Sequence, residues 1–229
     1  MIPNPFPGCF IAFEGIDGCG KSEQFKMMVV YLRTIFEKEM KKIGKCFVVK
    51  ETKEPGKERF WGAEIYRDLH KTDGLHKTNL FGFQAWYARD SKENLRKNII
   101  PSLECGCTVL ADRFRPSMVY GARFSYEIMA LMLLNQAIIG EDFIWPDAIF
   151  IFDIAVKTAV ERLKQKGRIL DGHENEKTLL ERVRSNYLAF GATYPNCHVI
   201  DGGGSPEEVF NKILPIAIAA IKSKSGSVV

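Results

Sequence analysis

The stretch Gly15-Ile16-Asp17-Gly18-Cys19-Gly20-Lys21-Ser22 matches the pattern G-x-x-x-x-G-K-[S/T] at every fixed position. It follows an apolar run and precedes a segment whose apolar residues recur at helical spacing. This order is typical of a phosphate-binding loop, because glycines let backbone amides turn inward and the helix N-terminus adds its positive dipole end. We expect residues 15–22 to bind ATP, with Lys21 on the β- and γ-phosphates and the Ser22 hydroxyl on Mg²⁺. A glycine-rich turn that only packs strand on helix is the alternative.

An acidic residue at the end of a later strand would complete such a site. Asp112 follows the apolar run 108–111, and a carboxylate at a strand end can hold Mg²⁺ directly or through water. Asp153 competes for the same role, but it precedes a helical pattern and can serve as its cap. We expect Asp112 to be the metal ligand, with a surface ion pair as the alternative.

Short apolar runs alternate with longer helical patterns along the chain. The runs are residues 9–13, 46–49, 108–111, 148–152 and 197–200, and the helical patterns are the segment after Lys21 and residues 126–140, 157–166, 176–194 and from 206 onward. Consecutive apolar residues are what strands buried on both faces require, which favours a parallel sheet covered by helices. The almost wholly apolar segment from Tyr126 predicts a central buried helix that ends at Gly140. The order predicts an open α/β sheet with its ligands at the carboxyl ends of the strands.

Length and charge restrict the function further. The 229 residues, of which 46% are hydrophobic, suffice for one core, so we expect a single domain over 1–229 with a frayed tail over 223–229. The net charge is +4, and no Lys/Arg block is dense enough to predict nucleic-acid binding. The small excess of basic residues can instead serve phosphorylated ligands.

Nothing in the sequence predicts export or a membrane. No apolar run reaches the about 18 residues of a spanning helix, and Met1 to Gly8 carries three prolines and no basic residue. The six cysteines show neither the spacing of a disulfide framework nor that of a zinc site. We therefore expect a cytoplasmic protein with free thiols.

Four segments in sequence order resemble the thymidylate kinase family of P-loop nucleoside monophosphate kinases. They are residues 13–22; 52–56, similar to T-R-E-P-G with Lys53 where arginine is usual; 112–114, similar to D-R-Y; and 170–187, similar to the stretch that follows the family's lid. The resemblance runs from about Phe10 to Glu208. It implies a P-loop fold with five parallel strands, flanking helices and a short lid. It also implies phosphoryl transfer from ATP to dTMP with Mg²⁺, in a homodimer.

The resemblance also implies roles for single residues. It places Asp17 opposite the 3′-hydroxyl of the acceptor sugar, Arg113 on the phosphates, and Ser117 at a kept position near the acceptor. Arg67 corresponds to an arginine on the acceptor phosphate, and Arg89 to one that contacts the base. The phosphate-binding loop holds no arginine. In that style of the family the lid, here about residues 164–175, supplies the catalytic cation, so Arg168 joins Lys21 and Arg113 as a catalytic residue, alone or with Lys166.

The base pocket departs from the family pattern. Ala85 stands where an aromatic residue stacks on thymine, with Phe83 and Trp86 nearby, and Gly121 and Ala122 stand where tyrosine and glutamine are common. Two alternatives to a dTMP kinase therefore remain open. One is a kinase for another deoxynucleotide or a nucleoside, and the other is a P-loop protein that binds nucleotide without metabolic turnover. An array of acceptor-side arginines favours the kinases, because a switch needs no second phosphate site.

Overall fold

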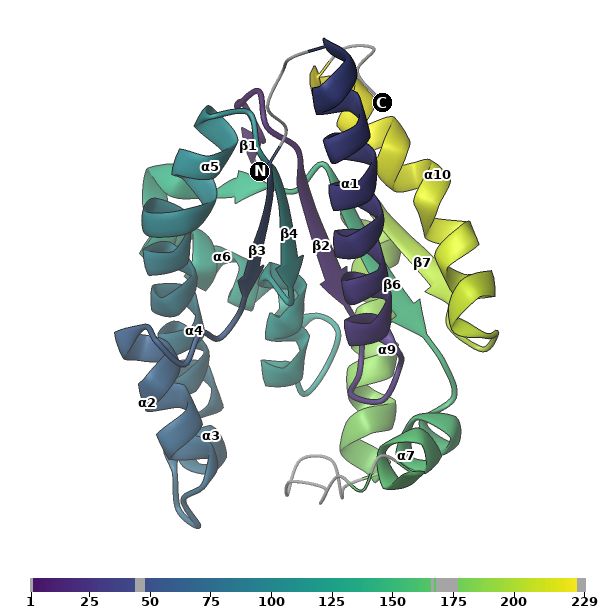
Figure 1. Cartoon of the computed structure of the whole chain (residues 1–229). Coiled ribbons are helices and arrows are strands. Elements are labelled where there is room, and N and C mark those ends of the chain that lie inside the picture. The colour runs from purple at the N-terminus through teal and green to yellow at the C-terminus, as the bar shows by residue number, and fades with distance from the viewer. Residues whose placement is uncertain (1, 44–47, 166, 168–176, 226–229) are drawn as a thin grey trace.

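The computed structural model describes residues 2–43, 48–165, 167 and 177–225, and in these ranges the chain forms one open sheet of five parallel strands (Figure 1). The strands are β2 (Phe10–Glu14), β3 (Val49–Lys53), β4 (Thr108–Asp112), β6 (Ala148–Asp153) and β7 (Cys197–Asp201), in the order β3-β4-β2-β6-β7. The α/β fold with a five-stranded parallel sheet is therefore confirmed. All five strands point the same way, so their carboxyl ends meet at one edge of the sheet.

Burial explains which strands the sequence predicts well. β2 and β4 are buried along their whole length, and their residues are accordingly almost continuously apolar. The run predicted over residues 46–49 is confirmed as a strand only at Val49. The strand begins at Val49 rather than at residue 46 and continues through the polar residues up to Lys53, whereas residues 44–47 lie outside the described ranges. β3 is an edge strand, and only Val49 is buried in it, so a polar sequence suffices there.

Helices cover both faces of the sheet. They are α1 (Lys21–Ile43), α2 (Phe60–Leu69), α3 (Leu75–Thr78), α4 (Leu80–Asn94), α5 (Ile100–Glu104), α6 (Glu127–Ile139), α7 (Val156–Gln165), α9 (Lys177–Thr193) and α10 (Pro206–Ser225). α1 and α10 pack side by side against one face, and α9 lies on the other (Figure 1). α4 continues through a π-helical turn, Leu95–Ile99, into α5, and a 3₁₀ segment, Arg115–Gly121, follows β4. α10 remains helical to Ser225, and residues 226–229 lie outside the described ranges.

The core lies between the sheet and these helices. Phe13 of β2 contacts the rings of Phe25 on α1 and of Phe150 and Phe152 on β6 at centroid distances of 5.5, 5.6 and 6.2 Å. All four side chains are buried. Burying each contributes roughly 1.5–3 kcal/mol, so this packing fixes the strand that leads into the glycine-rich loop against the helix that leaves it.

The helix α6 differs from the prediction. It ends before Gly140, whose φ is 70°, as the sequence indicates, but it is not buried all round. Met129 is 67% exposed and Leu133 is 60% exposed, although neither is polar. The helix therefore has one buried apolar side and one apolar side that none of the described residues covers.

A short pairing of two strands was not predicted from the sequence. Ile2–Pro3 (β1) and Ile144–Trp145 (β5) form a short parallel pair that joins the N-terminal segment to the residues before β6. Among the described helices, none has the length and apolar character needed to cross a membrane.

Candidate active site

The loop between β2 and α1 has the backbone that its glycines permit. The φ angles of Gly15, Gly18 and Gly20 are 138°, 84° and 97°, in a region that other residues rarely adopt. A Cβ atom on Gly18 would lie 2.4 Å from the carbonyl oxygen of Ala159 on α7. Glycine is thus required both by the turn and by the close approach of α7.

A cavity of about 480 Å³ opens beside this loop. Lys21 and Ser22 line it at the start of α1, and Gly202 and Gly204 line it in the segment between β7 and α10. Arg162 of α7 also lines the cavity, and both of its terminal nitrogens donate to the carbonyl oxygen of Gly202 at 3.2 Å. The loop amides and Lys21 can hold phosphates, and the remaining length of the cavity has room for a nucleoside.

The sequence analysis missed Arg162 and the residues around Gly202. Both lie far from the phosphate-binding loop in sequence, and one arginine on a charged helix carries no distinctive pattern. The glycines after β7 follow a strand end, and that position was the only available signal.

Asp17 connects two basic residues. Its Oδ1 lies 3.0 Å from the Lys21 Nζ and also accepts from the Nη2 of Arg113, at the end of β4. Lys21 is 7% exposed, so this carboxylate balances its charge in a nearly dry place. The structure therefore brings together three residues that the sequence analysis assigned to the donor and acceptor sides.

Arg113 has an unusual backbone and many partners. Its φ is 70°, in the left-handed region. Its Nη1 donates to Ser117 Oγ at 3.3 Å, to Tyr187 OH at 3.4 Å and to the carbonyl oxygen of Gly15 at 3.4 Å. Burial opposes its charge, but the neighbouring Asp17 and the other acidic groups outweigh burial and raise the pKa of Arg113 well above its ordinary value. Arg113 is therefore a permanent cation beside the loop.

Glu14 lies beneath Arg113 and is fully buried. Its Oε1 accepts from the backbone N–H of Phe114 at 2.6 Å, and its Oε2 accepts from Ser117 Oγ at 2.8 Å and Tyr187 OH at 2.9 Å. Burial raises the pKa of Glu14 to about 7, against the opposing influence of Arg113 and these hydrogen bonds. The sequence analysis assigned no role to this residue.

Asp112 presents an uncommitted oxygen. Its Oδ2 lies 3.3 Å from Lys53 Nζ, whereas its Oδ1 is buried and has no hydrogen-bond partner among the described residues. Both oxygens of the competing Asp153 are bound by Arg184, at 2.6 and 2.9 Å. A carboxylate oxygen without a partner fits a hard cation such as Mg²⁺ better than a carboxylate already paired with arginine.

The described residues contain no group of three acidic, histidine or cysteine side chains that could hold a metal ion. A cation at Asp112 would therefore complete its shell with phosphate oxygens and water, as Mg²⁺ does in nucleotide sites.

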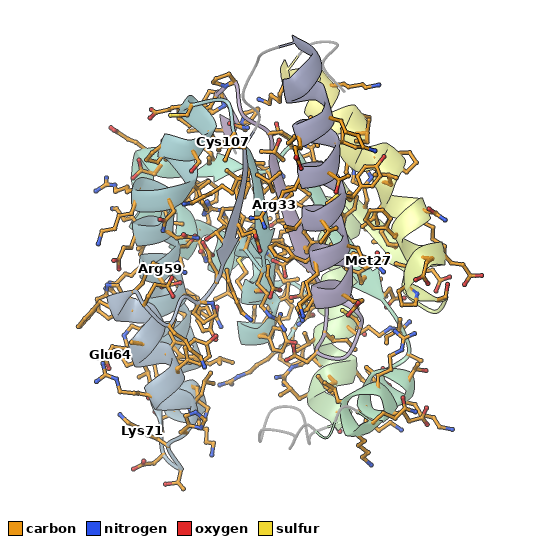
Figure 2. The ribbon with its side chains drawn as sticks, in the orientation of Figure 1. Met27, Arg33, Arg59, Glu64, Lys71 and Cys107 are labelled. Carbon is orange, nitrogen blue, oxygen red and sulfur yellow. The ribbon has the colours of Figure 1, made fainter. Side chains whose placement is uncertain are left out.

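The structure does not bring Arg67 and Arg89 to this cluster. Arg67 is largely exposed and pairs with Glu64 of the same helix, which Figure 2 shows on the side of α2 facing away from the sheet. Arg89 is exposed and its guanidinium lies 4.9 Å from the ring centre of Trp61. Both side chains are exposed in this structure, so the contacts of Arg67 and Arg89 with an acceptor stay predictions.

Two half-buried tyrosines, Tyr66 of α2 and Tyr87 of α4, feel the charge of Arg113. Burial raises the pKa of each hydroxyl, and Arg113 is the first opposing charge that acts on both. The buried arginine that follows the E-P-G segment is Arg59, labelled in Figure 2 at the start of α2. It binds both oxygens of Asp90 at 2.8 Å and so fastens that segment to α4.

The comparisons with known proteins agree with this geometry. The family model described as thymidylate kinase matches residues 13–213. A thymidylate kinase of Thermosipho africanus is 34% identical over 93% of this chain and 100% of the relative, and one of Thermosipho melanesiensis is 35% identical over 89% and 94%. The chain belongs to the thymidylate kinase family. A crystal structure of thymidylate kinase from Ehrlichia chaffeensis has the same fold, with a TM-score of 0.65 and 24% identity over 91% of this chain and 97% of that one.

One departure from the thymidylate kinase pattern has a structural reason. Gln84 of α4 is buried and packs against Gly121, so a Cβ atom on Gly121 would lie 2.4 Å from Gln84 Cγ. The larger residue common in the family at this position would require Gln84 to move. Phe83 is buried beside Tyr87, at a centroid distance of 5.3 Å, and therefore contributes to packing in this region.

Most of the lid expected over residues 164–175 lies outside the described ranges, and so do Arg168 and Lys166. The described part of this segment is the end of α7, up to Gln165, and Gly167.

Proposed function

We propose that this member of the thymidylate kinase family transfers the γ-phosphoryl group of ATP to dTMP, forming ADP and dTDP. The observation that carries the proposal is the shared Asp17, which joins Lys21 of the donor loop to Arg113 at the end of β4. A protein that only binds ATP needs no second permanent cation there. An acceptor phosphate between Arg113 and the donor would be held close to the transferring group.

Charge explains how such a site works without a catalytic base. The second pKa of a phosphate monoester is near ~6, so the attacking oxygen of dTMP is mostly ionised at neutral pH. Catalysis then requires positioning and neutralisation of charge on the phosphoryl oxygens. Lys21 and the inward amides of the loop would act on the donor, and Arg113, oriented by Ser117 and Tyr187, on the acceptor.

The residues that would hold Mg²⁺ are Ser22 and Asp112, because the Asp112 Oδ1 is buried without a partner among the described residues. When bound, the ion would offset the negative charge of the phosphate oxygens. The part of Asp112 in this proposal is to fix the ion on the side of the loop where β4 ends.

We also propose that the active form is a homodimer joined through α6. Tyr126, Met129 and Leu133 follow one another at helical spacing, and all three are exposed. An apolar stripe of this kind is rarely left in water. A second copy of the chain offers the same stripe, so the two copies could cover each other about a two-fold axis.

Membership of the thymidylate kinase family favours dTMP over other acceptors. The experiment is a coupled assay of ADP release with Mg-ATP and a panel of dTMP, dUMP, dCMP, dGMP and thymidine. The proposal expects dTMP to give the highest kcat/KM, and a purine monophosphate in first place would contradict it.

A further inference from the structure

Arg113 holds a backbone conformation that its side chain does not favour. A residue other than glycine at a φ of 70° is strained, and such residues persist where their surroundings fix them. The next peptide N–H, that of Phe114, donates to Glu14 Oε1 at 2.6 Å. This hydrogen bond holds the turn immediately after Arg113.

The second oxygen of Glu14 holds the other side of the same turn. Ser117 Oγ donates to Glu14 Oε2 at 2.8 Å, and Tyr187 OH of α9 donates to it at 2.9 Å. Both of these hydroxyls also lie within hydrogen-bond distance of Arg113 Nη1, at 3.3 and 3.4 Å. The groups that orient the guanidinium are thus themselves oriented by one carboxylate.

We propose that Glu14 is a positioning residue for the acceptor: its carboxylate fixes the turn Arg113–Ser117 and the Tyr187 hydroxyl, and through them the direction of the Arg113 guanidinium. The inference rests on the proposed function, because it treats Arg113 as the residue that meets the acceptor phosphate. Glu14 itself contacts neither substrate, since it is fully buried beneath the turn.

The carboxylate has a property that an amide lacks. Its two oxygens accept three hydrogen bonds. In a glutamine one oxygen is replaced by an N–H₂ group, which would face a hydrogen-bond donor of the cluster instead of accepting from it. The carboxylate also places a negative charge near Arg113, which adds to the effect of Asp17. Replacement by glutamine therefore preserves volume and removes both the third acceptor position and the charge.

The kinetic test compares Glu14→Gln with the wild-type chain. We expect KM for dTMP to rise about tenfold or more, because the acceptor side depends on this turn. The fold-change in KM for ATP should be smaller than the fold-change in KM for dTMP by a factor of about five or more. Tyr187→Phe removes one of the three donors and should change the same ratio in the same direction by a smaller factor. This second variant decides the matter if Glu14→Gln does not fold.

Asp147→Asn is the matched control. Asp147 accepts from the backbone N–H of Phe10 at 2.8 Å, so it binds the same strand at the opposite end from Glu14. It should leave both KM values unchanged. An unchanged ratio of KM values in folded Glu14→Gln, or in Tyr187→Phe if the glutamine variant does not fold, would overturn the inference.

Hydrogen exchange separates this inference from the proposed function. In Glu14→Gln the amides of residues 113–121 should exchange faster than in the wild-type chain, and those at the start of β2 should not change. Equal amide exchange rates over residues 113–121 in Glu14→Gln and in the wild-type chain would overturn the positioning role, even if the KM values differed. A wild-type chain that transfers no phosphate to any monophosphate would contradict the proposed function, and the exchange measurement would still decide whether Glu14 holds the turn.

Discussion

At the scale of single residues, Asp17 lets two cations lie close together in a nearly dry site. Lys21 and Arg113 would repel each other there without an intervening negative charge, because the local dielectric constant is low. Their common partner keeps both oriented on the side of the loop where phosphates are expected. Each can then exchange part of its contact with Asp17 for a contact with a phosphate oxygen.

Replacing Lys21 with alanine should abolish most phosphoryl transfer and leave the fold intact. Loss of one preorganised charge donor typically lowers kcat about 10²- to 10³-fold. The measurement is kcat, with the melting temperature as a check on folding. Lys26→Ala, an exposed lysine of the same helix, is the control and should be fully active. Turnover of Lys21→Ala at the wild-type rate would contradict the assignment of the loop.

Asp112→Asn should raise the Mg²⁺ concentration that gives half-maximal activity by about 10- to 100-fold. The amide loses the charge that the unpaired Oδ1 would offer to the ion. Asp153→Asn serves as the control, because both Asp153 oxygens are held by Arg184. If the two variants showed the same dependence on Mg²⁺, Asp112 would not be the ligand.

Glu14 makes the stability of the protein depend on pH. Burial raises its pKa from 4.5 to about 7, so between these pH values the folded state keeps a proton that the unfolded state has lost. The contribution of Glu14 to the free energy of unfolding therefore decreases as the pH rises through this range, and the decrease persists above it. Glu14→Gln cannot ionise and is free of this effect.

The melting temperature of Glu14→Gln minus that of the wild-type chain should be larger at about pH 8 than at about pH 5. Melting curves of both proteins at the two pH values measure this directly. The same temperature difference at both values would show that Glu14 is not the group that titrates.

At the scale of elements, α6 is the helix whose surroundings are incomplete in the single chain. Leu133→Glu would place a charge within the exposed stripe and should convert a dimer into a monomer of 26.0 kDa. Analytical ultracentrifugation measures the mass. Val30→Glu, at a position of α1 that is 65% exposed, is the matched control and should remain dimeric. A wild-type chain that sediments as a monomer at micromolar concentration would contradict the proposed dimer.

The sequence predicts buried strands better than exposed ones. The bounds of β2, β4 and β6 differ from the predicted runs by about one residue, because strands covered on both faces must be apolar throughout. β7 lies at the other edge of the sheet and is only partly buried, yet its short run over residues 197–200 also predicts its bounds to within one residue. β3 lies at the edge, where hydropathy gives no such signal, and its prediction was displaced. The apolar sequence of α6 indicated a helix but could not show that one side lacks a partner within the chain.

The sequence predicts the site residues whose identity a backbone turn requires. It predicts less well those whose position depends on which side of a helix faces the core. The loop glycines, Lys21, Asp112 and Arg113 follow strand ends, and the sequence places them without knowledge of packing. Successive residues of a helix point about 100° apart, so which residues of α2 and α4 are buried depends on packing, which the sequence alone does not show. Glu14 gave no signal, because a lone acid after an apolar run can turn either way.

At the scale of the whole molecule, one edge of the sheet carries both halves of the site. The phosphate-binding loop follows β2, Arg113 follows β4, and Gly202 follows β7, so parallel strands deliver donor and acceptor groups to the same place (Figure 1). Residues of α7 and of the start of α10 line the cavity beside the phosphate-binding loop. This arrangement predicts a reaction between two phosphorylated ligands.

The ratio of kcat/KM for dTMP over that for thymidine tests this claim most directly. Thymidine would leave Arg113 without an acceptor phosphate, and an unmet charged group costs about 1.5–3 kcal/mol or more. With ATP and Mg²⁺ in excess, we predict a ratio of about a hundredfold or greater in favour of dTMP. A ratio near one, or a preference for thymidine, would contradict the account.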